Sequence, residues 1–150
     1  MRGLRLGIAL VLASLAVGGL GAAPASAAGS YATRLSSACS GLRTQIQALG
    51  KPSDTPIAKV YPATVRIGRV FVKQLKLLHP PTAERARARS MVLEYGYYFD
   101  GLAYAYALLT KRHSQQGFIQ TAAGADANRA LAVGYARKLG APACSRQPFE

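Results

Sequence analysis

Two cysteines are the residues of this chain whose type and spacing most directly indicate chemistry. Cys39 and Cys144 stand near opposite ends of the 150-residue sequence. The N-terminus predicts export, and an even cysteine count in an exported chain predicts a disulfide. A redox pair or a thiolate metal site is disfavoured, because the chain has neither C-x-x-C spacing nor histidines beside the cysteines. We therefore expect a structural bridge.

Histidine offers little further chemistry, because the chain has 2 of them. His79 precedes two prolines, and His113 lies between two predicted helices. In the topology predicted below, these turns fall at opposite ends of the molecule, so the histidines should not share a metal or a catalytic centre. The H-E-x-x-H, G-x-S-x-G and Gly-rich phosphate-loop motifs are also missing. We expect no enzyme activity and no cofactor.

The carboxylates are few enough to consider singly. Glu94 and Asp100 stand six residues apart in an apolar helical segment and so point about 120° away from each other. This arrangement does not predict the paired carboxylates of glycoside hydrolysis. Each carboxylate is expected either to meet an Arg or Lys side chain or to lie at a helix crossing. Asp100 is the stronger candidate for a functional role, because a carboxylate among aromatic residues is costly to bury without a partner.

Tyrosines crowd the same segment. Tyr97 and Tyr104, one heptad apart, share a helix face with Gly101. With Asp100 nearby, these residues are candidates for a groove that carries a small apolar or aromatic ligand. The alternative is core packing, which is the expectation for Tyr98. Tyrosine with histidine can also hold haem, but no motif here supports haem binding.

A basic helix face is the best-organised polar feature. On a helix over residues 57–78, five cations fall within an arc of roughly 100°. A strand would scatter them over both faces. The face predicts attraction to an anionic membrane surface or envelope polymer, and its alternative is simple solvation. Nucleic acid is an unlikely partner, because exposed aromatics are not interleaved with the cations. The five residues of this basic face are Lys59, Arg66, Arg69, Lys73 and Lys76.

Four segments show the apolar periodicity of helices. The candidate residues described above lie on these segments or next to them. The segments span residues 30–49, 57–78, 82–112 and 115–139. Glycine and proline separate them, most clearly at His79-Pro80-Pro81. Short connections favour antiparallel neighbours. The predicted fold is all-α, an up-down-up-down four-helix bundle with one disulfide joining the first helix to the C-terminal tail.

Local signals refine this prediction. Thr55, Thr82 and Ser114 are candidate helix N-caps. Pro62 is expected to kink the start of the second helix. Gly96 and Gly101 are costly in a helix interior and are expected to permit close approach of a neighbouring helix.

The N-terminus has the three parts of a secretory signal peptide. Arg2 and Arg5 precede an apolar run over residues 6–20, and Ala25-Ser26-Ala27 provides the small-residue end. The run is short for a membrane span, so we expect cleavage after Ala27 and a single domain over residues 28–150. Cleavage removes two of the 19 basic and none of the 6 acidic residues, which leaves a net charge of +11. The expected location is secreted or extracytoplasmic.

One resemblance rests on these same features. Cys39, the break over residues 75–81 and the ending over residues 136–144 resemble uncharacterised small secreted or lipoprotein helical bundles of GC-rich bacteria. The resemblance spans most of the mature chain. It implies a helical fold and a disulfide, and it brings no activity.

The leading functional expectation is a non-catalytic envelope or extracellular module that binds an anionic surface or polymer through the basic face. The alternative is a small-ligand carrier that uses the tyrosine groove. A remote alternative is an enzyme acting on a small anionic substrate, of the kind that secreted chorismate mutases represent. Their catalytic pattern does not align with this chain. The sequence predicts no oligomeric state.

Overall fold

The computed structural model describes residues 25–50 and 56–146, and it confirms the predicted all-α class. Its four helices agree closely with the predicted segments. The predicted cap Thr55 and residues 1–24 of the predicted signal peptide lie outside the described residues. The elements are α1 (Ala25–Gln47), α2 (Ile57–Leu77), η1 (Thr82–Glu84), α3 (Arg85–Lys111), α4 (Gln115–Lys138) and η2 (Pro142–Ser145).

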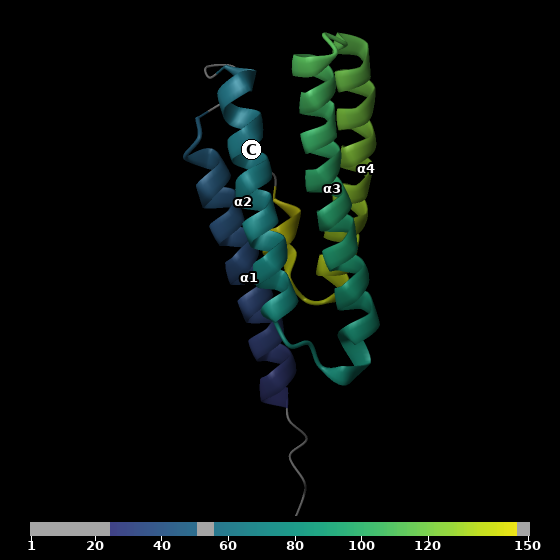
Figure 1. The fold of residues 1–150 in the computed structure, drawn as a ribbon. Helices are drawn as coiled ribbons and strands as arrows, with labels where there is room; N and C mark the ends of the chain where they lie inside the picture. Colours follow the sequence, from purple (N-terminus) through teal and green to yellow (C-terminus); the bar gives the residue numbers. More distant parts are fainter. Residues whose placement is uncertain (1–24, 51–55, 147–150) are drawn as a thin grey trace, which may run out of the picture.

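The helices lie side by side in two pairs. Figure 1 shows α1 beside α2 and α3 beside α4, with the short turn η2 between the pairs. The closest packing joins α3 to α4, and α2 also packs on α3. α1 contacts α2 and η2. These contacts between consecutive helices are consistent with the predicted bundle.

The core draws buried side chains from all four helices. Tyr31 and Leu35 of α1, Phe71 of α2 and Phe99 of α3 are each 2 % exposed or less. α4 contributes mainly alanines, such as the fully buried Ala132. Small side chains on α4 let its backbone come close to α3, which explains why this pair is the most tightly packed.

The disulfide connects the two ends of the described chain, as predicted. Cys39 and Cys144 are bonded across 105 residues, with Cα atoms 5.0 Å apart. Both cysteines are buried and belong to the core. The bridge fixes η2 against α1, which otherwise packs mainly on α2.

Glycines mark two of the helix crossings. A Cβ at Gly101 would lie 2.8 Å from the Cβ of Ala125 on α4, so the expected close approach at Gly101 is confirmed. The same expectation for Gly96 is wrong, because nothing lies within 4 Å of a Cβ built there. At Gly68 on α2, a Cβ would overlap the ring of Phe99 on α3. Gly68 therefore sets how closely α2 and α3 approach.

A proline inside α2 is accommodated by a contact from α3. Pro62 lies within the helix and has no N–H to donate to the carbonyl of Ala58 four residues earlier. The hydroxyl of Tyr106 donates to that carbonyl instead, at 3.3 Å. The ring of Tyr106 also stacks on that of Tyr61, with centroids 6.2 Å apart. α3 thus stabilises the proline-containing start of α2.

Helix ends follow the sequence signals in part. Ser114 caps α4, its Oγ accepting a hydrogen bond of 3.1 Å from the Gly117 N–H. Gly50 and Gly140 take the left-handed conformation just beyond α1 and α4. The expected cap at Thr82 is wrong, because Thr82 lies inside the turn η1 and caps nothing with its side chain. The prolines before it direct the chain into that turn, and α3 begins only at Arg85.

Candidate functional site

The basic face lies entirely on the solvent side of α2. Its five side chains, Lys59, Arg66, Arg69, Lys73 and Lys76, are all exposed. The apolar side of the same helix, including Val60, Phe71 and Leu75, is buried. α2 is therefore amphipathic, with its cations on one face and its apolar side chains on the other, as the sequence predicted.

Apolar side chains stand among these cations. Leu77 is 72 % exposed and Val70 is 47 % exposed. At 100° per residue, both fall beside Lys59, Arg66 and Lys73 on the outer surface of α2. Sequence analysis did not single out Leu77 and Val70, although the same helical projection contains the signal. The exposed side of α2 thus mixes positive charge with aliphatic surface.

α3 adds a second exposed apolar stripe. Leu93, Tyr97 and Tyr104 are 57 %, 58 % and 55 % exposed. Their spacing of four and seven residues places them on one face of the helix. Asp100 occupies the same face and is also exposed. This α3 stripe (Leu93, Tyr97, Asp100 and Tyr104) is not buried, despite the apolar character of the surrounding sequence.

An ion pair places the α3 stripe next to the basic face. Arg69 Nη2 lies 3.0 Å from Asp100 Oδ1. Because both side chains are well exposed, the pair contributes only about 0–1 kcal/mol to stability. The expectation that Asp100 meets a basic side chain is confirmed, whereas its burial among aromatics is not found. The basic face and the α3 stripe therefore meet at this pair.

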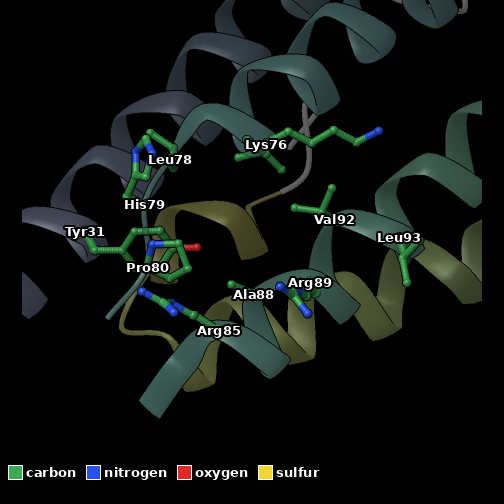
Figure 2. A pocket seen from close by; sticks show the side chains of 11 residues that line it. Tyr31, Lys76, Leu78, His79, Pro80, Arg85, Ala88, Arg89, Val92 and Leu93 are labelled. Atoms are coloured by element: carbon green, nitrogen blue, oxygen red, sulfur yellow. The ribbon is translucent and has the colours of Figure 1, made fainter. Parts of the chain in front are cut away.

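A pocket opens between α2 and α3 at the end where the two helices are joined. Figure 2 shows Tyr31 and Pro80 at one end of it beside Arg85, and Val92 and Leu93 toward the other end. Its volume is about 530 Å³, within the range of about 300–1,000 Å³ common for ligand pockets. Its apolar lining, besides Tyr31, is formed by Leu75, Leu78, Pro80, Ala88, Val92 and Leu93.

This Tyr31 pocket also has a cationic lining. Lys76, Arg85 and Arg89 contribute to it, His79 lies beside them in the lining, and all four side chains are exposed. Within the residues that the structure describes, none of the four forms an ion pair. Lys76 belongs to the basic face as well, so the pocket continues that surface.

One acidic residue, Glu84, acts on the Tyr31 end of the pocket. Burial raises the pKa of Tyr31, and the nearby charge of Glu84 raises it further, while Arg34 acts in the opposite direction. The hydroxyl of Tyr31 therefore keeps its proton to a higher pH than the hydroxyl of an exposed tyrosine. Glu84 does not line the pocket.

A second hollow lies beside the disulfide and is much smaller. Its volume of about 40 Å³ holds no more than a few water molecules. Tyr95 and Tyr98 line it, and burial raises the pKa of each to about 12. Arg129 also lines it and pairs with Asp126 at 2.7 Å. This hollow is too small for a metabolite.

The residues of the predicted tyrosine groove lie on the exposed face of α3 and not in the Tyr31 pocket. Tyr97 and Tyr104 point into solvent, and Gly101 between them packs against Ala125 of α4. Neither tyrosine lines the Tyr31 pocket or the hollow beside the disulfide. The groove therefore stays a prediction, and these tyrosines enter the site as part of the α3 stripe.

The histidines lie apart in the fold. His79 lines the Tyr31 pocket, and His113 is in the turn between α3 and α4 with a positive φ of 52°. Over residues 25–50 and 56–146, no three side chains of His, Cys, Asp or Glu gather where they would hold a metal ion. In the same part of the chain, no helix combines the length and the apolar character needed to cross a bilayer.

Comparison of the chain with protein-family models, with curated proteins and with solved structures finds no match. The candidate site therefore stands on its own geometry. Sequence analysis identified its basic face but missed the Tyr31 pocket. The available signal was the spacing of Arg85, Ala88, Arg89, Val92 and Leu93 on one face of α3. Only the structure shows that this face lies across from Lys76 and His79.

Proposed function

We propose that this protein is a non-catalytic, exported helical module that docks on an anionic membrane surface. One observation carries the proposal: exposed cations and large exposed apolar side chains are mixed on the outer face of α2, and this face meets the exposed α3 stripe. The Arg69–Asp100 ion pair joins the two parts of that surface. A merely solvated helix face has no need for Leu77 or Tyr97 in water.

Electrostatics supports the first step of docking. Each Lys or Arg near an anionic bilayer is worth about 1 kcal/mol, and the attraction falls off within a Debye length. The basic face offers five cations, of which only Arg69 has a carboxylate partner among the described residues. The net charge of +11 that cleavage after Ala27 leaves adds to the long-range attraction.

The exposed apolar side chains favour a membrane, rather than a soluble polyanion, as the binding partner. Large exposed apolar patches mark interaction sites, and tyrosine is favoured at the boundary between headgroups and water. Leu77 and Val70 would enter the headgroup region beside the cations, while Tyr97 and Tyr104 would lie at its boundary. A wall polymer would be bound by the charges alone.

The location follows from the same proposal. The disulfide is compatible with an extracytoplasmic compartment. The proposed export route is a signal peptide cleaved after Ala27, which leaves an up-down-up-down bundle outside the cytoplasm. The basic face then meets the outer surface of an anionic bilayer.

Co-sedimentation with vesicles tests the docking. The purified protein is mixed with vesicles of phosphatidylcholine alone or of phosphatidylcholine with phosphatidylglycerol, at low ionic strength and at about 0.15 M salt. We expect binding only to the anionic vesicles, weakened but not abolished by salt, because apolar contact persists. Equal binding to both vesicle types, or none to either, would refute the proposal.

A matched pair of leucines separates membrane insertion from charge attraction. Leu77→Gln removes an exposed leucine from the basic face, and Leu131→Gln removes one that is 54 % exposed on α4. Inserting a leucine side chain is worth about 1.5 kcal/mol or more, so Leu77→Gln should weaken vesicle binding about tenfold. Equal binding by the two variants would limit the contact to charge.

A further inference from the structure

The Tyr31 pocket has features that membrane docking does not use. It combines an apolar lining from α2 and α3 with cationic side chains that have no carboxylate partner among the described residues. The basic-face cations other than Arg69 also lack such a partner, so what distinguishes the pocket cations is the apolar cavity beside them. Cations beside an apolar cavity and without a partner of their own suit a ligand that brings the negative charge.

We propose that the Tyr31 pocket binds a single-chain amphiphile, a molecule with an apolar tail and one anionic head group. Arg85 and Arg89 bind the head, with the Tyr31 hydroxyl as a further donor. The tail lies toward Val92 and Leu93, which Figure 2 shows at the end of the pocket away from Tyr31 and Pro80. The head group is a phosphate, sulfate or carboxylate, which share the same acceptor chemistry.

The geometry of α3 supports this division of roles. Arg85, Arg89 and Leu93 follow one another at intervals of four residues, so they line the pocket along one helix face. Ala88 forms the buried floor between them. Its small side chain keeps the cavity open. A head group at the arginine end and a tail along the helix therefore match the order of the side chains.

A free inorganic anion does not explain the pocket. The cations are distributed around the cavity, and Figure 2 places Lys76 well apart from Arg85. A small anion would contact few of them and would leave the apolar lining in water. An amphiphile gains from both surfaces, because charge-assisted hydrogen bonds fix the head and burial stabilises the tail.

Calorimetric titration with dodecyl phosphate, kept below its micelle-forming concentration, tests the proposal. We expect saturable binding of one molecule per chain, with backbone amide NMR shifts confined to residues 75–93 and the start of α1. Inorganic phosphate and dodecanol serve as probes for the head and the tail alone. Each should bind at least about tenfold more weakly than dodecyl phosphate. Binding of dodecanol as tight as that of dodecyl phosphate would overturn the proposal.

Two charge-matched double variants locate the head group. Arg85→Gln with Arg89→Gln should weaken dodecyl phosphate binding about a hundredfold, since each charged hydrogen bond is worth about tenfold. Arg112→Gln with Arg137→Gln removes the same charge from exposed sites outside the pocket and should leave binding unchanged. Equal affinity of the two double variants would overturn the assignment.

A further pair of variants separates this inference from membrane docking. Val92→Thr should weaken amphiphile binding and leave vesicle binding intact, because the half-buried Val92 lines the pocket but lies outside the α3 stripe. Lys59→Gln with Lys73→Gln should weaken vesicle binding and leave amphiphile binding intact. If the Lys59/Lys73 variant loses both activities, the amphiphile binds the basic face and the pocket assignment is wrong.

Discussion

At the scale of single residues, tyrosine has three distinct roles. Tyr97 and Tyr104 are exposed on the α3 stripe, Tyr95 is buried in the core, and Tyr106 satisfies a backbone carbonyl. The sequence placed all four on one helix, and helical projection separates Tyr97 from its buried neighbours. It cannot show that Tyr106 reaches Ala58, because that contact depends on how α2 and α3 are offset along their axes.

Alkaline pH should destabilise the fold through Tyr95. Burial raises its pKa from 10.0 to about 12, so between these values the unfolded chain loses the proton while the folded chain keeps it. The stabilising contribution is present below pH 10 and is lost as pH rises toward 12, by about 3 kcal/mol in all. Tyr95→Phe should remove this loss. Urea unfolding of both proteins at pH 8 and pH 11.5 checks it, and parallel declines in stability would contradict the assignment.

Tyr106→Phe should destabilise the start of α2. The substitution leaves the Ala58 carbonyl without the hydroxyl that replaces the missing Pro62 N–H, at a cost of about 1 kcal/mol. Tyr104→Phe, an exposed tyrosine two residues away, should change stability by less than about 0.5 kcal/mol. Thermal unfolding measures both. An equal effect of the two substitutions would show that the hydrogen bond contributes nothing.

At the scale of secondary-structure elements, helix extents were predictable and helix contacts were not. Glycine and proline act locally, so Gly50, Pro80 and Gly140 end helices whatever packs against them. Apolar periodicity identifies a buried face but not its partner. The contact of Gly68 with Phe99 and the Arg69–Asp100 pair depend on the rotation and offset of α2 against α3.

Glycine substitutions should distinguish crossing points from open helix positions. Gly68→Ala puts a methyl group into the ring of Phe99, and overpacking should cost about 1–3 kcal/mol. Gly124 on α4 has nothing within 4 Å of an added Cβ, so Gly124→Ala should stabilise by about 0.5–1 kcal/mol. Chemical unfolding midpoints measure the two effects. Stabilisation by Gly68→Ala would show that α2 and α3 do not cross there.

At the scale of the whole molecule, the disulfide fastens α1 to the C-terminal end. α1 packs on α2 and η2, and η2 also packs on α4. The bridge therefore closes the structure between its first and last described elements. The sequence allowed this pairing to be predicted, because Cys39 lies on the apolar stripe of the first helix and Cys144 follows the helix-ending Gly140.

Loss of the disulfide should lower stability and loosen α1. In the chain-entropy model, a bridge across about 100 residues is worth up to about 4–5 kcal/mol. Cys39→Ala with Cys144→Ala should lose much of this, and amide exchange should accelerate most in α1 and η2. Hydrogen exchange of both forms checks the prediction. Uniform acceleration over all four helices would contradict a specific role in holding α1.

The candidate surface also belongs to this scale, because it joins two helices and the pocket between them. The basic face was predictable from the spacing of its cations. The shared helix face of Tyr97 and Tyr104 was predictable as well, but its contact with the basic face and the Tyr31 pocket became evident only when α2 and α3 were seen together. The proposed membrane docking depends on this combined surface rather than on total charge.

Vesicle binding by two charge-matched triple variants tests this account most directly. Lys59, Arg66 and Lys73 are replaced by Gln in one variant, and the exposed Arg112, Arg137 and Lys138 in the other. Both proteins lose three charges. At about 1 kcal/mol for each cation at the surface, the first should bind anionic vesicles about a hundredfold more weakly than the wild-type protein, while the second stays close to it. Equal weakening of both would show that net charge alone drives binding and that no docking face exists.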